Sequence, residues 1–544
     1  NVGTVQRTYA TGAVSGLNSG GVSGFISVSG TVQNSYWDKG TTDQGSVIAI
    51  DNGGTTSGLT GYGSTSDATP APEIQGSSAS SNMGNLDFTS IWETVENDDA
   101  DTTGDGYPIL QSIDRQAQLE AQDVYAYAGG DGSTDNPYEI ANWYHLNNTR
   151  ENLDAEFILT AGLDSNTAGY DDVASSSANG GNGFDPIGDD GSRFTGTFNG
   201  TGHTISDLFI DRSVYVGLFG YVDGGRVENV GVVDADISVF IGWMGGLVGY
   251  NDQGTVSGSY ATGHVSGASG GTDGTHVGGL VGENNGGTVT ESHAASSVGG
   301  NVWIGGLVGT NEGGLITESF ATGNVSSSSG AGGLVGKNSG TVTESYATGD
   351  ASGVITVVGG LAGQNSGTVN ESYATGDVEA AANVGGLVGR IKSGTVSGSY
   401  ATGDVTGDNG RAGGFAGEKN GGAITDGYWD DEAATVTEGG STVDNQGVSD
   451  GGGDVIALTT TEMQRFAPLA NMDGFSFESP ETWLVTSGYP ALAWESVTEL
   501  TVDSVESTSP TVGENESGTI TVTAKQSGTD TGEGVTIEVV SDDG

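Results

Sequence analysis

The stretch GGLVGKNSGTVTESYATGDASG, residues 332–353, decides the fold of this chain because variants of it recur along the middle of the sequence. The pentapeptide GGLVG, or a close variant, begins at Gly245, Gly278, Gly305, Gly332, Gly359, Gly385 and Gly413, after a degenerate copy at Val216. Successive copies are 29, 33, 27, 27, 27, 26 and 28 residues apart. A nearly constant period of this length predicts a solenoid in which each repeat contributes one coil.

Apolar residues inside each repeat are few and alternate with polar ones, as in GTVTESYATG. Gly, Asn and Ser interrupt them, which favours brief strands and tight turns over helices. We therefore expect an all-β, parallel β-solenoid with about three short strands in each coil of about 27 residues. Strands of successive coils would pair about 4.8 Å apart, so eight coils would extend for roughly 40 Å.

Stacked coils place equivalent residues in columns. The leucine column is Leu247, Leu280, Leu307, Leu334, Leu361 and Leu387. The aromatic column is Tyr260, His293, Phe320, Tyr346, Tyr373, Tyr400 and Tyr428. The asparagine column is Asn251, Asn284, Asn311, Asn338 and Asn365. We expect the first two columns to lie in the core, because identical side chains pack well in stacked sheets, and the asparagines to turn corners and hydrogen-bond their stacked neighbours.

The order GGLVGxNxGxVxxSYATGxV, followed over about residues 216–430, resembles the GLUG repeat. The GLUG family occurs in secreted and surface-attached proteins of bacteria and archaea, including large haloarchaeal surface proteins. The resemblance implies a β-solenoid that works outside the cell or on its surface.

The charge of the chain excludes some functions and suggests an environment. Seventy acidic residues against 14 basic ones give a net charge of −56, which excludes a nucleic-acid-binding protein. The acids are scattered singly among apolar residues, which favours a folded acidic surface in concentrated salt, as in a halophilic prokaryote, over disorder. No cysteine is present, and no apolar run approaches the length of about 18 residues that spans a membrane, so we expect no membrane insertion.

The head of the chain repeats the end of the later repeats. TYATG at 8, SYWDKG at 35, SIWETV at 90 and DGYPIL at 105 match SYATG at 399, GYWDDE at 427, ETWLV at 481 and SGYPAL at 487. We therefore expect residues 1–122 to end one module and residues 126–497 to form a complete one, within a longer parent protein. The complete module would have a cap at 126–193, coils at 194–430 and a second cap at 431–497. Residues 498–544 alternate like the first strands of an immunoglobulin-like sandwich.

Both ends of an open solenoid need a cover. In the first cap we expect a helix with Trp143, Leu146 and Leu153 on one face. In the second cap, Thr459 and Glu462 form a capping box, which starts a short helix with Met463 and Phe466. The side chains expected to seal the C-terminal end are Trp483, Tyr489, Leu492 and Trp494.

Enzymes that cleave acidic polysaccharides also use parallel β-solenoids, and they cluster Asp with Lys or Arg on one face. The cations of the repeats occupy unequal positions: Lys337, Arg390, Lys392, Arg411 and Lys419. The five histidines are scattered along the sequence. We therefore expect no enzyme, no catalytic residue and no required cofactor, with a polysaccharide-binding or polysaccharide-cleaving β-helix as the alternative.

Carboxylates recur at one position of four successive coils: Glu291, Glu318, Glu344 and Glu371. Stacked like charges repel unless they are screened or bridged, so we expect solvated glutamates in high salt, with divalent-cation binding as the alternative. The run DDADTTGDG resembles part of a calcium loop through Asp99, Asp101 and Asp105, but it lacks the carboxylate expected at the twelfth position. The sequence therefore assigns no metal site, and Ca²⁺ or another cation stays open at these aspartates.

Five Asn-x-Ser/Thr sequons are candidates for glycosylation: Asn147, Asn199, Asn324, Asn370 and Asn515. No other feature suggests chemistry. The sequence predicts a non-enzymatic, extracellular structural or adhesive module of a large cell-surface or filament-forming protein. It would act as a rigid spacer whose repeated weak contacts add through avidity. The expected partners are other surface proteins, cell-surface glycans or copies of the chain itself.

Overall fold

The computed structural model describes residues 127–495 except 268–274, Thr356, 444–445, 451–454, Phe466 and 478–480. The earlier described pieces are 4–6, 9–10, 23–26, 31–38, 48–51, 55–62, 76–84, 86–88, 92–95 and 106–110, and the later ones are 500–507, 520–526 and 535–538. The chain divides into two compact units, Asn1–Val173 and Ala174–Gly544. We describe each unit by itself.

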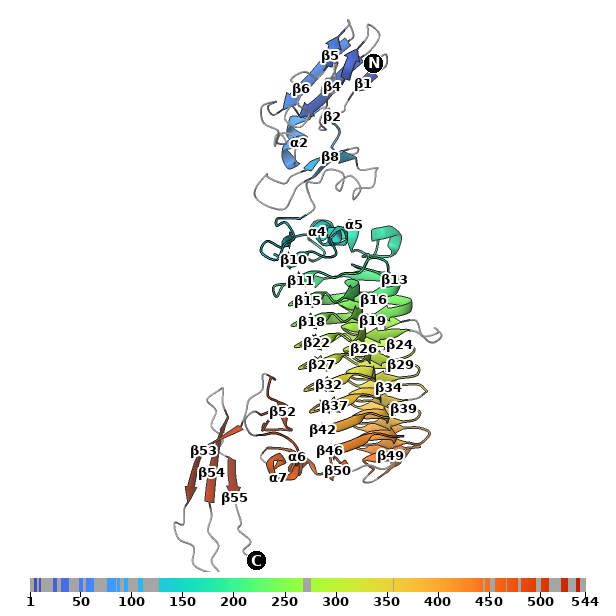
Figure 1. Cartoon of the computed structure of the whole chain (residues 1–544), viewed down its shortest axis with the longest axis vertical. Helices are drawn as coiled ribbons and strands as arrows, with labels where there is room; N and C mark the ends of the chain where they lie inside the picture. Colours follow the sequence, from blue (N-terminus) through green and yellow to red (C-terminus); the bar gives the residue numbers. More distant parts are fainter. Residues whose placement is uncertain are drawn as a thin grey trace, which may run out of the picture. The chain divides into compact units, whose positions relative to one another are not determined.

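The second unit contains a parallel β-solenoid (Figure 1). One of its walls is a nine-stranded sheet. Its strands are β14 (Phe219–Asp223), β17 (Val248–Asp252), β21 (Val281–Asn285), β26 (Val308–Glu312), β31 (Val335–Asn338), β36 (Ala362–Asn365), β41 (Val388–Ile391), β45 (Ala416–Lys419) and β49 (Val448–Asp450). Each strand pairs with its counterpart one coil later, for example Val308 with Val335 and Asn311 with Asn338.

The other walls are parallel ladders of the same kind. One contains β11 (Thr197–Asn199), β15 (Arg226–Glu228), β18 (Thr255–Ser257), β22 (Thr288–Thr290), β27 (Leu315–Thr317), β32 (Thr341–Thr343), β37 (Thr368–Asn370), β42 (Thr395–Ala401) and β46 (Ala423–Asp430). β50 (Val455–Leu458) pairs with the second half of β46, in the register of the aromatic column. The next contains β12 (Thr204–Ser206), β16 (Gly231–Met244), β19 (Tyr260–Gly267), β23 (His293–Ala294), β28 (Phe320–Ala321), β33 (Tyr346–Ala347) and β38 (Tyr373–Ala374). A further ladder contains β13 (Phe209–Val216), which pairs with β16, and β24 (Ser297–Gly300), β29 (Val325–Ser327), β34 (Ala351–Gly353), β39 (Val378–Ala380), β43 (Val405–Gly407) and β47 (Val436–Glu438). The last contains β20 (His276–Gly278), β25 (Ile304–Gly305), β30 (Ala331–Gly332), β35 (Val358–Gly359), β40 (Val384–Gly385) and β44 (Ala412–Gly413).

The parallel solenoid predicted from the period is confirmed, but its coils are divided more finely than expected. The repeat that contains residues 332–353 contributes to strands β30 to β34, so a coil has about five short strands rather than three. Glycines at the corners explain the short strands. A Cβ atom on Gly332 would lie 2.0 Å from the carbonyl oxygen of Val335, and one on Gly333 would lie 2.0 Å from that of Gly360. These glycines are needed for close backbone contact, which a side chain would prevent.

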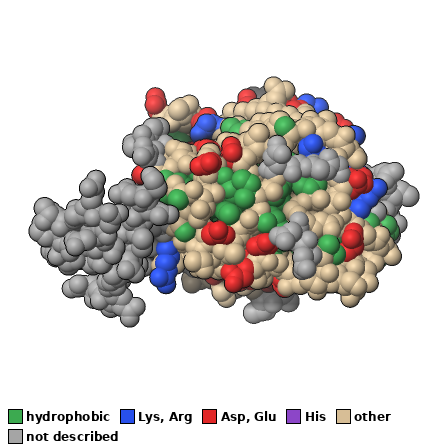
Figure 2. All heavy atoms as spheres, turned by 90° about the horizontal axis from the view of Figure 1, so that it is seen from below, with side chains coloured by type: hydrophobic (Ala, Val, Ile, Leu, Met, Phe, Trp, Pro, Cys, Tyr) green, Lys and Arg blue, Asp and Glu red, His purple; other side chains and the backbone are tan. Residues whose placement is uncertain are grey.

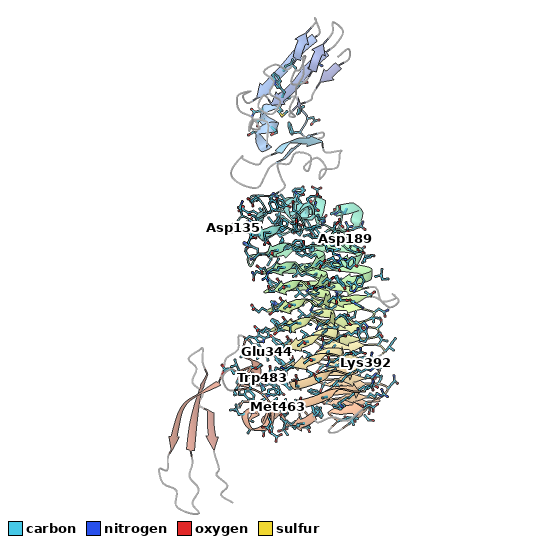
Figure 3. All side chains as sticks on the ribbon, in the orientation of Figure 1. Asp135, Asp189, Glu344, Lys392, Met463 and Trp483 are labelled. Atoms are coloured by element: carbon cyan, nitrogen blue, oxygen red, sulfur yellow. The ribbon has the colours of Figure 1, made fainter. Side chains whose placement is uncertain are left out.

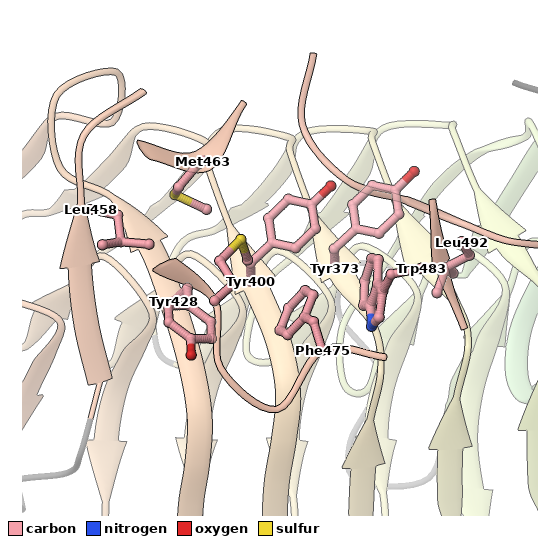
Figure 4. Close-up of a cluster of buried hydrophobic side chains, with 9 residues drawn as sticks. Tyr373, Tyr400, Tyr428, Leu458, Met463, Phe475, Trp483 and Leu492 are labelled. Carbon is pink, nitrogen blue, oxygen red and sulfur yellow. The ribbon is translucent and has the colours of Figure 1, made fainter. Parts of the chain in front are cut away.

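The segment that follows β50 lies along the side of the coils (Figures 1 and 4). It contains α6 (Thr460–Met463), α7 (Pro468–Asn471) and the antiparallel pair β51 (Trp483–Leu484) and β52 (Ala491–Leu492). The predicted capping box is present, since the Thr459 side chain accepts from the Glu462 N–H and Glu462 accepts from the Thr459 N–H. Phe466 lies outside the described residues. We call residues 459–495 the C-terminal cover.

The first unit includes a described segment at 127–173. It contains β9 (Tyr138–Ile140), α4 (Trp143–Asn148), η2 (Thr149–Glu151), β10 (Glu156–Leu159), which pairs with β9, and α5 (Tyr170–Val173). Trp143 and Leu146 are buried as expected, but Leu153 lies in the turn after the helix, because α4 ends at Asn148. His145 is buried beneath the Asn142 side chain, and desolvation lowers the pKa of its imidazole to about 4. The role of this segment as a cap, and the bounds 126–193, remain predictions.

The earlier pieces of the first unit show the same pairings as the end of the solenoid. They are β1 (Thr4–Gln6), β2 (Tyr9–Ala10), β3 (Ser23–Ile26), β4 (Thr31–Asp38), β5 (Ile48–Asp51), β6 (Thr55–Tyr62), α2 (Gly76–Asn82), β7 (Trp92–Val95) and β8 (Gly106–Leu110). Tyr9 pairs with Tyr36 as Tyr400 pairs with Tyr428. Trp92 pairs with Leu110 as Trp483 pairs with Leu492. The module bounds 1–122 and 126–497 remain predictions.

Three strands follow the cover in sequence. They are β53 (Leu500–Ser507), β54 (Ile520–Gln526) and β55 (Val535–Glu538), and they form an antiparallel sheet. The immunoglobulin-like identity of residues 498–544 remains a prediction.

Candidate functional site: the columns of the solenoid

The leucine column lies inside the coils. All six of its leucines have no exposed surface, and Val256, Val289, Ile316, Val342, Val369 and Val396 form a second buried column. Each of these side chains packs between copies of itself in the coils before and after. This column supports the coils and presents nothing to a partner.

The asparagine column is also buried, and its amides form a continuous chain of hydrogen bonds. Nδ2 of each asparagine donates to Oδ1 of the next, at 2.8 Å from Asn251 to Asn284 and 2.9 Å from Asn311 to Asn338. The same Nδ2 atoms also donate to backbone carbonyls of the corner, as from Asn284 to Gly287. The series ends where Ile391 pairs in register with Asn365. Each amide thus satisfies buried polar groups of two coils at once.

Sequence analysis missed two further polar columns. The N–H of Ser292 donates to Oγ of Ser319, whose hydroxyl donates to the carbonyl of Thr317. The N–H groups of the serines before Tyr260, Phe320, Tyr346 and Tyr373 donate to the next serine in the same way. In the second column, the N–H of Asp404 donates to Oδ1 of Asp377 and that of Asp377 to Asp350. The recurring Ser and Asp of SYATGD were a visible signal for both. Some of the many carboxylates therefore fasten one coil to the next.

The glutamate column occupies a corner with left-handed backbone. Glu291, Glu318, Glu344 and Glu371 have φ values of 48°, 46°, 46° and 45°. Equivalent positions in other coils hold Asn229, Gly258, Gly398 and Asp426, also with positive φ. Burial, together with the charges of Glu371 and Glu318, raises the pKa of the Glu344 carboxyl. Among the residues that the structure describes, no group of three or more His, Asp or Glu side chains is placed to hold a metal ion.

The aromatic column differs from the expected core column. Its rings stack on the outside of the coils, with centroids 4.6 Å apart from His293 to Phe320 and 4.9 Å from Tyr373 to Tyr400. Tyr373, Tyr400 and Tyr428 are buried, whereas Tyr260, His293, Phe320 and Tyr346 are partly exposed. The prediction that the whole column lies in the core was therefore wrong for its N-terminal half. Rings can stack without being enclosed, because the strand register alone aligns them.

The C-terminal cover buries the other half of this column (Figure 4). Trp483 and Phe475 pack against Tyr400, and Trp494 packs against Phe320 and Tyr346. Tyr400 donates to the carbonyl of Pro490 at 2.6 Å, and Tyr428 to that of Asp473 at 2.7 Å. Burial raises the pKa of Tyr428 to about 12. The side chains expected to seal the end of the stack thus cover its side instead.

Figure 3 agrees with this placement. Glu344 and Trp483 lie on one side of the coils, and Lys392 lies on the opposite side (Figure 3). Viewed along the coils from the C-terminal end, hydrophobic side chains gather between scattered carboxylates (Figure 2). Exposed apolar residues of this part of the chain include Ile456 and Leu469.

A variable column runs along the outer surface of the nine-stranded sheet. Its members pair in register: Tyr221, Tyr250, Glu283, Thr310, Lys337, Gln364, Arg390, Glu418 and Asp450. They occupy the x of GLVGx, the position that differs from repeat to repeat. Sequence analysis did not single them out because only recurring residues form a signal. This is the surface on which the repeats are free to differ.

The two ends of the variable column have different chemistry. At the C-terminal end, Glu418 is buried and pairs with both Arg390 and Arg411, and Arg411 also pairs with Asp450 at 3.1 Å. In the middle, Lys337 pairs with Glu312 at 3.0 Å. At the N-terminal end, aromatic rings of Tyr221 and Tyr250 lie 4.8 Å apart. Three of the five cations considered for an enzyme site, Lys337, Arg390 and Arg411, are thus engaged in ion pairs.

The remaining sequence candidates are dispersed. Asp99, Asp101, Asp105 and Asn515 lie outside the described residues. Asn324 is exposed, while Asn147, Asn199 and Asn370 are half-buried. The Asn199 amide donates to Glu228, and Oδ1 of Asn370 accepts from Ser397. In the part of the chain that the structure describes, no helix is long and apolar enough to cross a membrane.

Comparisons with known proteins identify the repeat. The family described as the GLUG motif matches residues 244–266. Halomucin of Haloquadratum walsbyi is 31% identical over 48% of this chain and 4% of its own length. A protein named as a Gly-rich membrane protein of Evansella cellulosilytica is 37% identical over 22% of this chain and 13% of its own length. The chain thus corresponds to a small part of either relative.

Among solved structures, the chain is similar to a protein described as a putative immunoglobulin A1 protease from Bacteroides ovatus. It is 20% identical and covers 68% of this chain and 96% of its own, with a TM-score of 0.38. A likeness this weak carries no argument about the activity of this chain.

Proposed function

Because residues 244–266 match the GLUG motif, we propose that the chain is a non-enzymatic structural and adhesive module of a larger cell-surface protein. It acts as a stiff spacer that carries weak contact sites along its length. The partners are other surface proteins, cell-surface glycans or copies of the chain, and the organism is a halophilic prokaryote.

The observation that carries this proposal is the continuous register from Phe219 to Asp450. Every inner coil is bonded to both of its neighbours through backbone ladders. Buried Asn and Ser side chains and exposed Asp side chains add further bonds between many of these coils. Bending or shearing the stack breaks several of these bonds together, which makes the solenoid stiff. Because the partly exposed members of the variable column, such as Tyr250 and Lys337, differ from coil to coil, weak contacts can add along one axis.

The acidic composition supports the proposal that the protein works in concentrated salt. At a net charge of −56 the surface repels itself in dilute solution, and salt near 1 M shortens the range of that repulsion to about 3 Å. The matched relative from Haloquadratum walsbyi supports the same setting.

A bead assay tests both halves of the proposal. The whole chain is coupled to beads, which are mixed with glycan-coated beads, with bare beads and with each other in about 3 M salt. We expect aggregation with at least one partner, while polysaccharides in the supernatant keep their length. Beads that stay dispersed with every partner overturn the adhesive role, and shortened polysaccharide overturns the non-enzymatic one.

A further inference from the structure

An aromatic patch lies at the N-terminal end of the variable column. It gathers the rings of Tyr215 from β13, Tyr221 from β14, Trp243 from β16 and Tyr250 from β17, of which Tyr221 is buried. Tyr215 pairs in register with Trp243, and Tyr221 pairs with Tyr250, so the patch spans two adjacent columns of successive coils. Only 7% of the chain is aromatic, which makes this concentration informative.

The rings hold each other in fixed orientations. Tyr215 and Trp243 stack with centroids 5.1 Å apart and planes 9° apart. Tyr250 stands nearly perpendicular to both, at 6.0 Å and 5.3 Å. All three rings remain partly exposed, and Val214 and Ile241, which are close to Tyr215 and Trp243 in the sequence, are 44% and 42% exposed. The patch is therefore a rigid, solvent-facing apolar surface.

Polar groups surround the rings. Oε2 of Glu283 accepts from Trp243 Nε1 at 2.6 Å and contacts His276 Nδ1 at 2.6 Å. The Arg193 guanidinium lies 4.6 Å from the centre of the Tyr221 ring and pairs with Asp223. Tyr221 itself donates to Asp252 at 3.0 Å. A carboxylate oxygen can accept more than one hydrogen bond, and the Asp223 side chain is 37% exposed.

The fold does not need these aromatic residues. The same outer column holds Thr310, Lys337 and Gln364 in later coils, which stack in the same register. Val214 has a φ of 90°, a conformation that β-branched residues rarely adopt, and it lies at a register shift after Arg212. Strained backbone beside a solvent-facing apolar patch is typical of a binding surface.

We propose that this aromatic patch binds a neutral polysaccharide. Aromatic rings pack against the C–H faces of sugar rings, and the surrounding Glu283, Asp252 and Arg193 offer acceptors and donors to sugar hydroxyls. Two successive coils contribute the rings and a third contributes Glu283, so the patch together with this carboxylate extends for roughly 10 Å, enough for more than one sugar ring. A neutral ligand avoids the repulsion that a polyanion or a second copy meets from a chain of net charge −56.

This site deepens the adhesive half of the proposed function and rests on it. The test uses the whole chain in about 3 M salt with insoluble cellulose, chitin, xylan and mannan, followed by titration with soluble oligosaccharides of the polymer that is bound. We expect Trp243→Ala and Tyr250→Ala each to lose about tenfold or more in affinity. Tyr260→Ala, which removes a partly exposed ring from another face, is the matched control and keeps parental affinity. Thermal melting establishes that both patch variants are folded.

The outcomes separate this site from the general function. Binding that is absent from all four polymers, or unchanged in both patch variants, overturns the sugar site. Self-association that is lost in Trp243→Ala, measured by sedimentation, overturns it in favour of a second copy or another protein as occupant. If beads carrying Trp243→Ala still aggregate, the adhesive function stands but does not depend on this site. If polysaccharide is shortened, the proposal that the module is not an enzyme is overturned.

Discussion

The two halves of the aromatic column stack alike but have different surroundings. Ring centroids are 4.9 Å apart from Tyr260 to His293 and 4.9 Å apart from Tyr373 to Tyr400. Yet Tyr260 is partly exposed and Tyr400 is only 1% exposed. The spacing comes from the strand register, whereas burial comes from the C-terminal cover. The comparison shows that a repeat can align side chains without determining which of them are enclosed.

The largest effect is expected where the cover meets the column. Trp483 is buried against Tyr373, Tyr400 and Phe475. We expect Trp483→Ala to lower the free energy of unfolding by about 3–5 kcal/mol, because a large buried ring leaves a cavity. Denaturant unfolding measures the change, with hydrogen exchange of residues 459–495 as a local readout. Leu469→Ala, at a 54% exposed position of the cover, should change little; equal losses in both variants would refute the central place of Trp483.

A single hydroxyl distinguishes the two halves directly. Tyr400→Phe leaves the carbonyl of Pro490 without its 2.6 Å hydrogen bond in a buried site, so we expect a loss of about 1–3 kcal/mol. Tyr260→Phe makes the same change at a partly exposed ring and should alter stability by less than about 0.5 kcal/mol. Urea unfolding of the two variants measures the difference. Equal effects would show that the cover contributes nothing specific through this bond.

Substitutions in the glutamate column test whether the backbone is strained beside both halves of the aromatic column. Glu291 and Glu344 have φ values of 48° and 46°, and glycine adopts this conformation without steric cost. We expect Glu291→Gly and Glu344→Gly each to stabilise the chain by about 0.5–1 kcal/mol in dilute salt, after the entropy cost of glycine. Thermal melting measures this, with Glu344→Gln as the control that removes charge but keeps the side chain. A loss of stability in both glycine variants would show that the left-handed backbone at these glutamates is not strained.

The smallest effect concerns pH at the edge of the cover. Burial, followed by the charges of Glu371 and Glu318, raises the pKa of Glu344 above its ordinary value. Burial also raises the pKa of Glu495, which accepts from Tyr373. A raised pKa in the folded state means that the folded chain binds more protons, so this contribution to stability is present at low pH and is lost as pH rises through the raised pKa. Urea midpoints from about pH 4 to 7 should fall less steeply with pH in Glu344→Gln and Glu495→Gln than in the parent. Identical slopes would show that these carboxyls do not contribute.

The predictable part of the fold is what each repeat contains. Leu334 and Asn338 occupy their columns because every coil supplies an equivalent residue, so period and position were sufficient. The left-handed glutamate corner also left a signal, since Asn229, Gly258 and Asp426 occupy the same position in other coils. Trp243 and Tyr250 left no such signal in the sequence, because the residues at a variable position do not recur. Only the stacked coils show that these side chains lie together.

The sequence by itself determined the coil, its period and the columns, because these depend on residues within one repeat meeting their copies in the next. Tertiary structure alone decided which columns are buried and which side chains are accessible to a partner. Trp494 donates to the carbonyl of Glu344 across 150 positions of sequence, and no repeat pattern records such a contact. The cover buries Tyr400 and leaves Tyr260 accessible because it extends along only part of the column.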